Sequence, residues 1–131
     1  MVRLKKPSLI VNFKTFEAAT GKNSDKLAKK LDIPGIVVAA QNTDIYRVSK
    51  VAKNVFAQHV DPQGHGQFTG HDNACALKEN GAAGVIINHS EDRVDLETIR
   101  KNIEICKKVG LISLVCIGGH DKAEEVARMN P

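Results

Sequence analysis

The chain has 131 residues, of which 42% are hydrophobic and 26% are charged; these values are ordinary for a soluble globular protein and predict a single domain over residues 1–131. Its net charge of +4 is small, and its lysines are mixed with acidic residues, which argues against nucleic-acid binding. No apolar run near the N-terminus is long enough for a signal peptide or a membrane span. The three cysteines follow no pairing pattern, so we expect reduced thiols in a cytoplasmic protein.

Apolar runs rich in β-branched residues predict strands, each followed by a helix-like segment. In chain order they are Ser8–Phe13, Gly35–Ala40, Val55–Gln58, Gly84–Asn88 and Leu111–Ile117. Apolar and polar residues do not alternate in these runs, so we expect strands buried on both faces, in a parallel sheet covered by helices. Right-handed crossovers leave two architectures open, a doubly wound sheet or part of a barrel.

The segments between the strands carry helix signals. Glu17–Leu31 is a helical region, and Thr43 is placed to cap a turn after the second strand. Gly81 and Gly110 are placed to end helices, and Asp121 is placed to cap the last one. The residues expected to share buried helix faces are Ile45, Val48 and Ala52 after the second strand, and Leu96, Ile99, Ile103 and Cys106 after the fourth.

Polar residues follow the predicted strands at their carboxyl ends, where the chemistry of βα proteins collects. Asn12 and Lys14 lie two apart, so in a strand both would face one pocket. An amide and a lysine suit an anionic substrate with hydroxyl or carbonyl oxygens. The simpler alternative is a lysine that reaches solvent at a strand end.

A second cluster follows the fourth strand. Ser90 is placed where a short helical turn would begin, so His89 would lie at a helix N-terminus, whose dipole favours the neutral imidazole. A neutral imidazole can donate a hydrogen bond to a developing enolate oxygen. An ordinary hydrogen-bonded histidine is the simpler alternative.

Taken together, these motifs resemble archaeal-type triosephosphate isomerase. The similar stretches occur in the same order: NFK at 12–14, AQHVDP at 57–62, TGH at 69–71, NHSE at 88–91, and VGL followed by VC at 109–116. The resemblance implies an α/β fold of repeated βα units with parallel strands, an incomplete (βα)8 barrel holding about five of the eight units.

The resemblance also implies roles for single residues. Asn12 and Lys14 would bind a triose phosphate, with Lys14 stabilising negative charge near the reacting oxygens. His89 would be the electrophile that moves protons between two substrate oxygens, and Glu91 would hold Lys14 in place. The reaction would interconvert dihydroxyacetone phosphate and glyceraldehyde 3-phosphate, a step of glycolysis and gluconeogenesis, through an enediolate and without a metal or organic cofactor.

Residues 59–71 resemble the family's protruding third loop, which docks into a neighbouring subunit. We therefore expect a homo-oligomer formed through this loop, or association with a complementary C-terminal chain. A metal site formed by His59, His65 and His71 is the alternative. It is disfavoured because these histidines lack metal-ligand spacing and cysteine support.

In the family, a stretch similar to Arg128–Pro131 runs into the sixth strand, which leads to the glutamate that removes the substrate proton. The loops that grip the phosphate come later still. We therefore expect a poor or inactive isomerase from these 131 residues alone, since loss of a general base costs about 10²- to 10⁴-fold in rate. The alternatives are a catalytically inactive βα scaffold or assembly module derived from the family and a different phosphosugar enzyme, against which the NFK and NHSE motifs argue.

Overall fold

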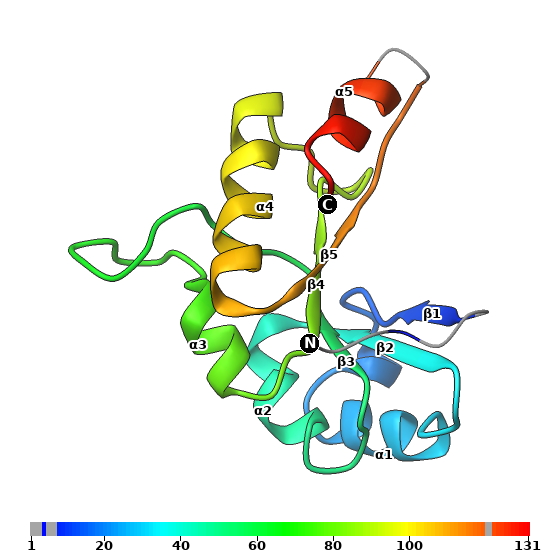
Figure 1. The fold of residues 1–131 in the computed structure, drawn as a ribbon. Coiled ribbons are helices and arrows are strands. Elements are labelled where there is room, and N and C mark those ends of the chain that lie inside the picture. The colour runs from blue at the N-terminus through cyan, green and yellow to red at the C-terminus, as the bar shows by residue number, and fades with distance from the viewer. Residues whose placement is uncertain (1–3, 5–7, 120–121) are drawn as a thin grey trace.

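The computed structural model describes residue 4 and residues 8–119 and 122–131 (Figure 1). It contains the strands β1 (Leu9–Asn12), β2 (Ile36–Ala40), β3 (Val55–Ala57), β4 (Gly84–Ile87) and β5 (Ile112–Val115). The helices are α1 (Lys22–Lys30), α2 (Ile45–Val48), α3 (Ala74–Glu79), α4 (Leu96–Val109) and α5 (Ala123–Arg128), with the 3₁₀ helices η1 (Glu17–Ala19) and η2 (Asn42–Asp44). Each of these strands lies inside the range predicted from the sequence.

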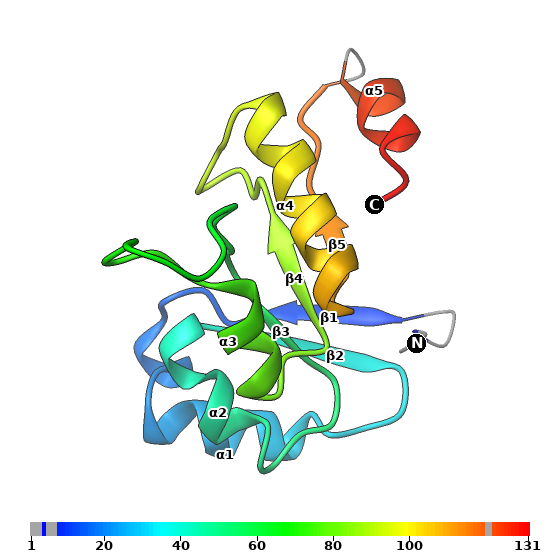
Figure 2. The same cartoon turned by 60° about the vertical axis from the view of Figure 1, so that its left-hand side comes forward.

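The strands form a parallel sheet in the order β1-β2-β3-β4-β5. Each strand pairs with the next one along the chain, with Asn12 opposite Ala39 and Ile87 opposite Val115 at the carboxyl ends of two of these pairs. A doubly wound sheet reverses its strand order at a switch point, whereas a barrel does not. The uninterrupted order and the curl of the sheet, with α1 to α4 on its outer side (Figure 2), confirm part of a (βα)8 barrel.

Alternate residues of each central strand enter two different apolar clusters. Val38 and Ala40 of β2 pack in the cluster that includes the helices, whereas Val37 and Ala39 pack in an inner cluster with Phe56. All five side chains are at most 1% exposed. Burial on both faces is the reason why these strands show no polar alternation.

The helix ends are set by local chemistry. Gly110 adopts the left-handed conformation after α4, at φ 77°, and Gly81 follows α3 at φ 102°, so both predicted glycine stops are confirmed. The helix starts use caps that the sequence analysis did not select. The Asp95 carboxylate accepts a hydrogen bond from the Thr98 amide at 2.7 Å, and the Asn73 side chain caps α3.

Two helix predictions are wrong in detail. Thr43 lies inside η2 and caps nothing; the acidic side chain beside it, Asp44, accepts a hydrogen bond from the Gly21 amide at the start of α1. The predicted helical region over Glu17–Leu31 is divided, because Gly21 has φ 58° and separates η1 from α1. The predicted cap Asp121 lies outside the described residues.

The short helical turn predicted to begin at Ser90 does not develop into a helix. The structure has a single hydrogen-bonded turn there, closed by the Asp92 amide and the His89 carbonyl at 2.9 Å. The next helix, α4, begins only at Leu96, so the helix dipole invoked for His89 has no source in this loop. α4 is 14 residues long, and none of the helices in the described part of the chain is long and apolar enough to cross a membrane.

Gly84 tests how closely the sheet is packed. A methyl group at this position would lie 2.5 Å from the Phe56 ring and 2.6 Å from the Ile112 carbonyl oxygen, and neither the ring nor the backbone can withdraw freely. We expect Gly84→Ala to lower the free energy of unfolding by about 1–3 kcal/mol, measured by urea unfolding. Gly64→Ala is the matched control, because its methyl group would meet nothing within 4 Å. Equal unfolding midpoints for the two variants would contradict this packing.

Candidate active site

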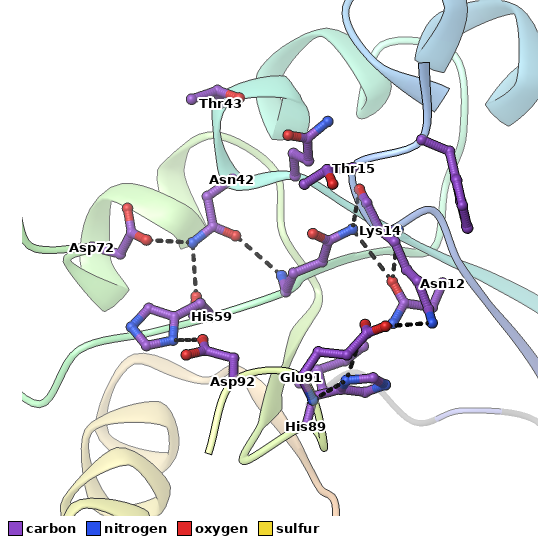
Figure 3. A pocket seen from close by; sticks show the side chains of 14 residues that line it. Asn12, Lys14, Thr15, Asn42, Thr43, His59, Asp72, His89, Glu91 and Asp92 are labelled. Atoms are coloured by element: carbon purple, nitrogen blue, oxygen red, sulfur yellow. Dashed lines mark hydrogen bonds and ion pairs between the residues drawn. The ribbon is translucent and has the colours of Figure 1, made fainter. Parts of the chain in front are cut away.

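A cavity of about 680 Å³ opens at the carboxyl ends of the strands (Figure 3). The loops after β1, β2, β3 and β4 all contribute polar side chains to it, and the candidate residues from the sequence are among them. The lining residues that carry charge or a polar group are Asn12, Lys14, Thr15, Gln41, Asn42, Thr43, Gln58, His59, Asp72, His89, Glu91 and Asp92. Because parallel strands end at one edge, residues far apart in the sequence meet here.

Lys14 enters this cavity from a turn that follows β1, whereas the sequence predicted that it would point there from the strand. β1 ends at Asn12, and Lys14 lies beyond it with φ 49°, a left-handed conformation that is uncommon for a lysine. The Asn12 side-chain oxygen accepts a hydrogen bond from the Lys14 amide at 2.9 Å. A turn therefore orients Lys14, and the strand alternation assumed from the sequence does not apply.

Lys14 and Glu91 form an ion pair across the cavity. The lysine Nζ lies 2.7 Å from the glutamate Oε1, and the two side chains are 39% and 57% exposed. The hydrogen bond from Lys14 lowers the pKa of Glu91 below its ordinary value, and the positive charge of the lysine adds to this effect. Glu91 is therefore the carboxylate that holds the ammonium group at this edge of the sheet.

His89 lies beside the same glutamate. The Glu91 backbone amide donates a hydrogen bond to the His89 Nδ1 at 3.2 Å. A ring nitrogen that accepts a hydrogen bond carries no proton, so in this arrangement Nε2 carries the ring hydrogen. The backbone amide of this turn therefore favours a hydrogen-bond donor at Nε2, while the Glu91 Oε2 lies 3.5 Å from Nδ1.

The side-chain amides of Gln58 and Asn42 connect the candidate residues to each other. No role was predicted for either of them from the sequence. The Gln58 side chain donates toward the Asn12 side-chain oxygen at 3.3 Å and the Lys14 carbonyl at 3.1 Å. The Gln58 backbone amide in turn donates to the Asn42 side chain at 3.0 Å. Their position directly after β3 and β2 was the available signal, but it does not specify which atoms they contact.

A second polar group surrounds His59. Its Nε2 lies 3.0 Å from the Asp61 Oδ1, and its Nδ1 lies 2.8 Å from the Asp92 Oδ2. Partial burial lowers the pKa of His59, but the hydrogen bond to Asp61 and the nearby carboxylates outweigh it and raise the pKa above its ordinary value. Partial burial raises the pKa of Asp61, but the hydrogen bonds from the Asp72 amide and His59 lower it further than burial raises it.

The remaining candidates from the sequence do not join this arrangement as a group. His71 approaches Asp61 at 3.4 Å, whereas His65 is exposed in the projecting loop, so the three histidines do not converge. Cys106 is buried, and burial raises the pKa of its thiol to about 11, which fits a packing role. Burial also raises the pKa of Cys116.

The chain is similar to known proteins over nearly its whole length. The family model described as triosephosphate isomerase matches residues 7–130. The triosephosphate isomerases of Methanosarcina barkeri and Methanobacterium bryantii are each 39% identical over 132 aligned positions, which include 95% of this chain and 60% and 58% of those proteins.

A solved structure has the same fold. The crystal structure of triosephosphate isomerase from Bartonella henselae superimposes with a TM-score of 0.74, at 22% identity, over 96% of this chain and 60% of that one. The chain thus spans about three fifths of the length of the relatives it matches. From the family match over almost all of its residues, it follows that the chain belongs to the triosephosphate isomerase family.

Proposed function

We propose that these residues form the electrophile-and-lysine half of a triosephosphate isomerase site, which acts in the interconversion of dihydroxyacetone phosphate and glyceraldehyde 3-phosphate. One observation carries the proposal. Glu91 contacts both candidate groups, Lys14 through its carboxylate at 2.7 Å and His89 through its backbone amide at 3.2 Å. A cation and a hydrogen-bond donor are thereby held together in one cavity.

The chemistry follows from these two groups. A base removes a proton from the carbon of dihydroxyacetone phosphate next to the carbonyl, and the electron pair forms the carbon–carbon double bond of an enediolate. The carbonyl oxygen becomes negative, where the Lys14 ammonium stabilises it. His89 donates its Nε2 proton to that oxygen and takes a proton from the neighbouring hydroxyl. Return of a proton to the other carbon then gives glyceraldehyde 3-phosphate.

The resemblance to the family implies that the base and the phosphate-binding loops follow the stretch matched here, and the match covers 60% of the Methanosarcina barkeri enzyme. Among the described residues, three acids line the cavity. Glu91 is paired with Lys14 and Asp92 with His59, and Asp72 accepts a hydrogen bond from Asn42, so each of them already has a partner within this chain. We infer that a complementary C-terminal segment or chain supplies the base, and that the 131 residues alone are a poor or inactive isomerase.

An inactive assembly module derived from the family is the second candidate. The loop of residues 59–71 projects from the body (Figures 1 and 2) and carries Phe68, which is 47% exposed. Phe16, at the rim of the cavity, is 64% exposed. Exposed aromatic side chains are common in surfaces that bind another protein, and the same loop would serve a homo-oligomer of an active enzyme.

Fusion to a complement separates these candidates. The chain is joined to the part of the Methanosarcina barkeri enzyme that it does not cover, and consumption of glyceraldehyde 3-phosphate is followed with a coupled dehydrogenase. We expect the fusion to be active and the unfused chain to be slower by about 10²-fold or more. His89→Ala should lower the rate of the fusion by about 10²- to 10⁴-fold, with an unchanged circular dichroism spectrum. A folded fusion that is inactive, or that is indifferent to this substitution, would support the assembly module.

The Lys14–Glu91 pair can be tested without substrate. We expect Lys14→Met to raise the pKa of the Glu91 carboxyl group toward its ordinary value, because the cause of its depression is removed. Because the folded carboxyl group has the lower pKa, the pair stabilises the fold above the unfolded pKa of Glu91 and ceases to do so as the pH falls through the folded value. NMR titration of the carboxyl carbon measures the shift. Lys22→Met, an exposed change on α1, is the control, and an equal shift there would refute a specific pair.

A further inference from the structure

The loop after β3 brings together three side chains that are able to bind a metal ion. One potential ligand atom from each of His59, Asp61 and Asp72 lies within 4.8 Å of the others, and all three residues are partly buried. The histidine and the first aspartate are already in hydrogen-bond contact, Nε2 to Oδ1, at 3.0 Å. Small side-chain rotations would bring such atoms to the distances of about 2.0–2.2 Å that transition metals require from nitrogen and oxygen ligands.

The imidazole is oriented from outside this trio. The Nδ1 atom of His59 lies 2.8 Å from the Oδ2 atom of Asp92, which belongs to the loop after β4. A histidine that binds a metal through one ring nitrogen characteristically donates its other ring hydrogen to a carboxylate, which fixes the tautomer and the ring plane. Asp92 is in the position of that carboxylate, so Nε2, which lies 3.0 Å from the Asp61 Oδ1, is the ring nitrogen left for an ion.

The aspartates are also held in place by neighbours. The Asp72 backbone amide donates to the Asp61 Oδ2 at 2.8 Å, and the Asn42 side chain donates to the Asp72 Oδ2 at 2.7 Å. These contacts use one oxygen of each carboxylate. The Asp61 Oδ1 points to His59, and none of the contacts described for the Asp72 side chain involves its Oδ1. The loop is therefore ordered before any ion arrives, which reduces the entropy lost on binding.

The local charge is negative. Asp61, Asp72 and Asp92 place three carboxylates around one imidazole. Across the described part of the chain, no lysine or arginine forms an ion pair with any of these three, and their charged contacts are with His59 and His71. A divalent cation would supply the missing positive charge at this edge of the pocket, and Figure 3 shows His59, Asp72 and Asp92 apart from Lys14 and Glu91.

We propose that His59, Asp61 and Asp72 form a binding site for a divalent transition-metal ion, with Asp92 orienting the imidazole. One imidazole nitrogen and two carboxylate oxygens suit Zn²⁺, Mn²⁺ or Co²⁺. Mg²⁺ and Ca²⁺ take oxygen ligands almost exclusively and should bind more weakly. The ion would join the loop after β3 to the loop after β4 through Asp92. It would lie at the edge of the cavity that His59 and Asp72 line, without replacing Lys14 or His89.

Calorimetric titration of the tag-free 131-residue chain with ZnCl₂ at constant pH tests this site. We expect saturable binding of one ion per chain, with excess Mg²⁺ failing to displace it. Asp72→Asn keeps the shape of the side chain and its contact with Asn42, but it should weaken Zn²⁺ binding by about tenfold or more. His59→Ala should do the same. The absence of saturable binding to the unsubstituted chain would overturn the proposal.

Two controls distinguish this site from surface binding. His65→Ala removes an exposed imidazole from the same loop, and Glu79→Gln removes an exposed carboxylate from α3; neither should change the affinity. If His59→Ala fails to fold, the ¹⁵N chemical shift of the His59 Nε2 in the unsubstituted chain reports ligation directly. The proposal would be overturned if Zn²⁺ binding persisted in Asp72→Asn or was lost in His65→Ala. It would also be overturned if Zn²⁺ left the chemical shift of the His59 Nε2 unchanged. The calorimetric result is independent of isomerase activity.

Discussion

Parallel pairing of each strand with its successor is the constraint on which the rest of the structure depends. It fixes β1 to β5 side by side with their carboxyl ends at one edge. The pairing is maintained by burial on both faces, because alternate residues such as Val37 and Val38 pack in different apolar clusters. A one-residue slip of β2 would exchange those faces. The loops after β1, β2, β3 and β4 are therefore brought to the same cavity.

Beyond this edge, backbone atoms have no neighbouring strand with which to form hydrogen bonds. The side-chain amides of Gln58 and Asn42 form hydrogen bonds with them instead. Gln58 donates to the Asn12 side chain at the end of β1 and to the Lys14 carbonyl in the loop that follows. Asn42 accepts from the Gln58 backbone amide and donates to the His59 carbonyl at 2.9 Å. This chain of hydrogen bonds links the loops after β1, β2 and β3. It explains how Lys14 keeps a left-handed backbone, since both its amide and its carbonyl are engaged. It also places the His59 group and the Lys14 group in one pocket.

The sequence predicts the strands and the glycine stops well, because buried parallel strands and left-handed helix ends have strong local signatures. It fails where a loop is shaped by contacts with distant residues. Thr43 was expected to cap the turn after the second strand and does not, whereas its neighbour Asp44 accepts a hydrogen bond from the Gly21 amide, 23 residues earlier in the chain. Lys14 is aimed by a turn, whereas the sequence pattern suggested a strand. The sequence predicts that Gln58 lies at a strand end. It does not predict which atoms accept its hydrogen bonds, because these depend on the register of three strands.

If the side chains of Asn12 and Gln58 hold Lys14 in place, hydrogen exchange of the Lys14 amide should show it. This amide donates to the Asn12 side chain, which also receives a hydrogen bond from Gln58. We expect measurable protection of this amide that falls by about two- to tenfold in Gln58→Ala, the range expected for one hydrogen bond. The Val38 amide, bonded within the sheet to the Asn54 carbonyl at 2.9 Å, should remain as protected as before. A Lys14 amide that exchanges freely, or that is equally protected in the unsubstituted chain and in Gln58→Ala, would mean that these hydrogen bonds do not hold Lys14.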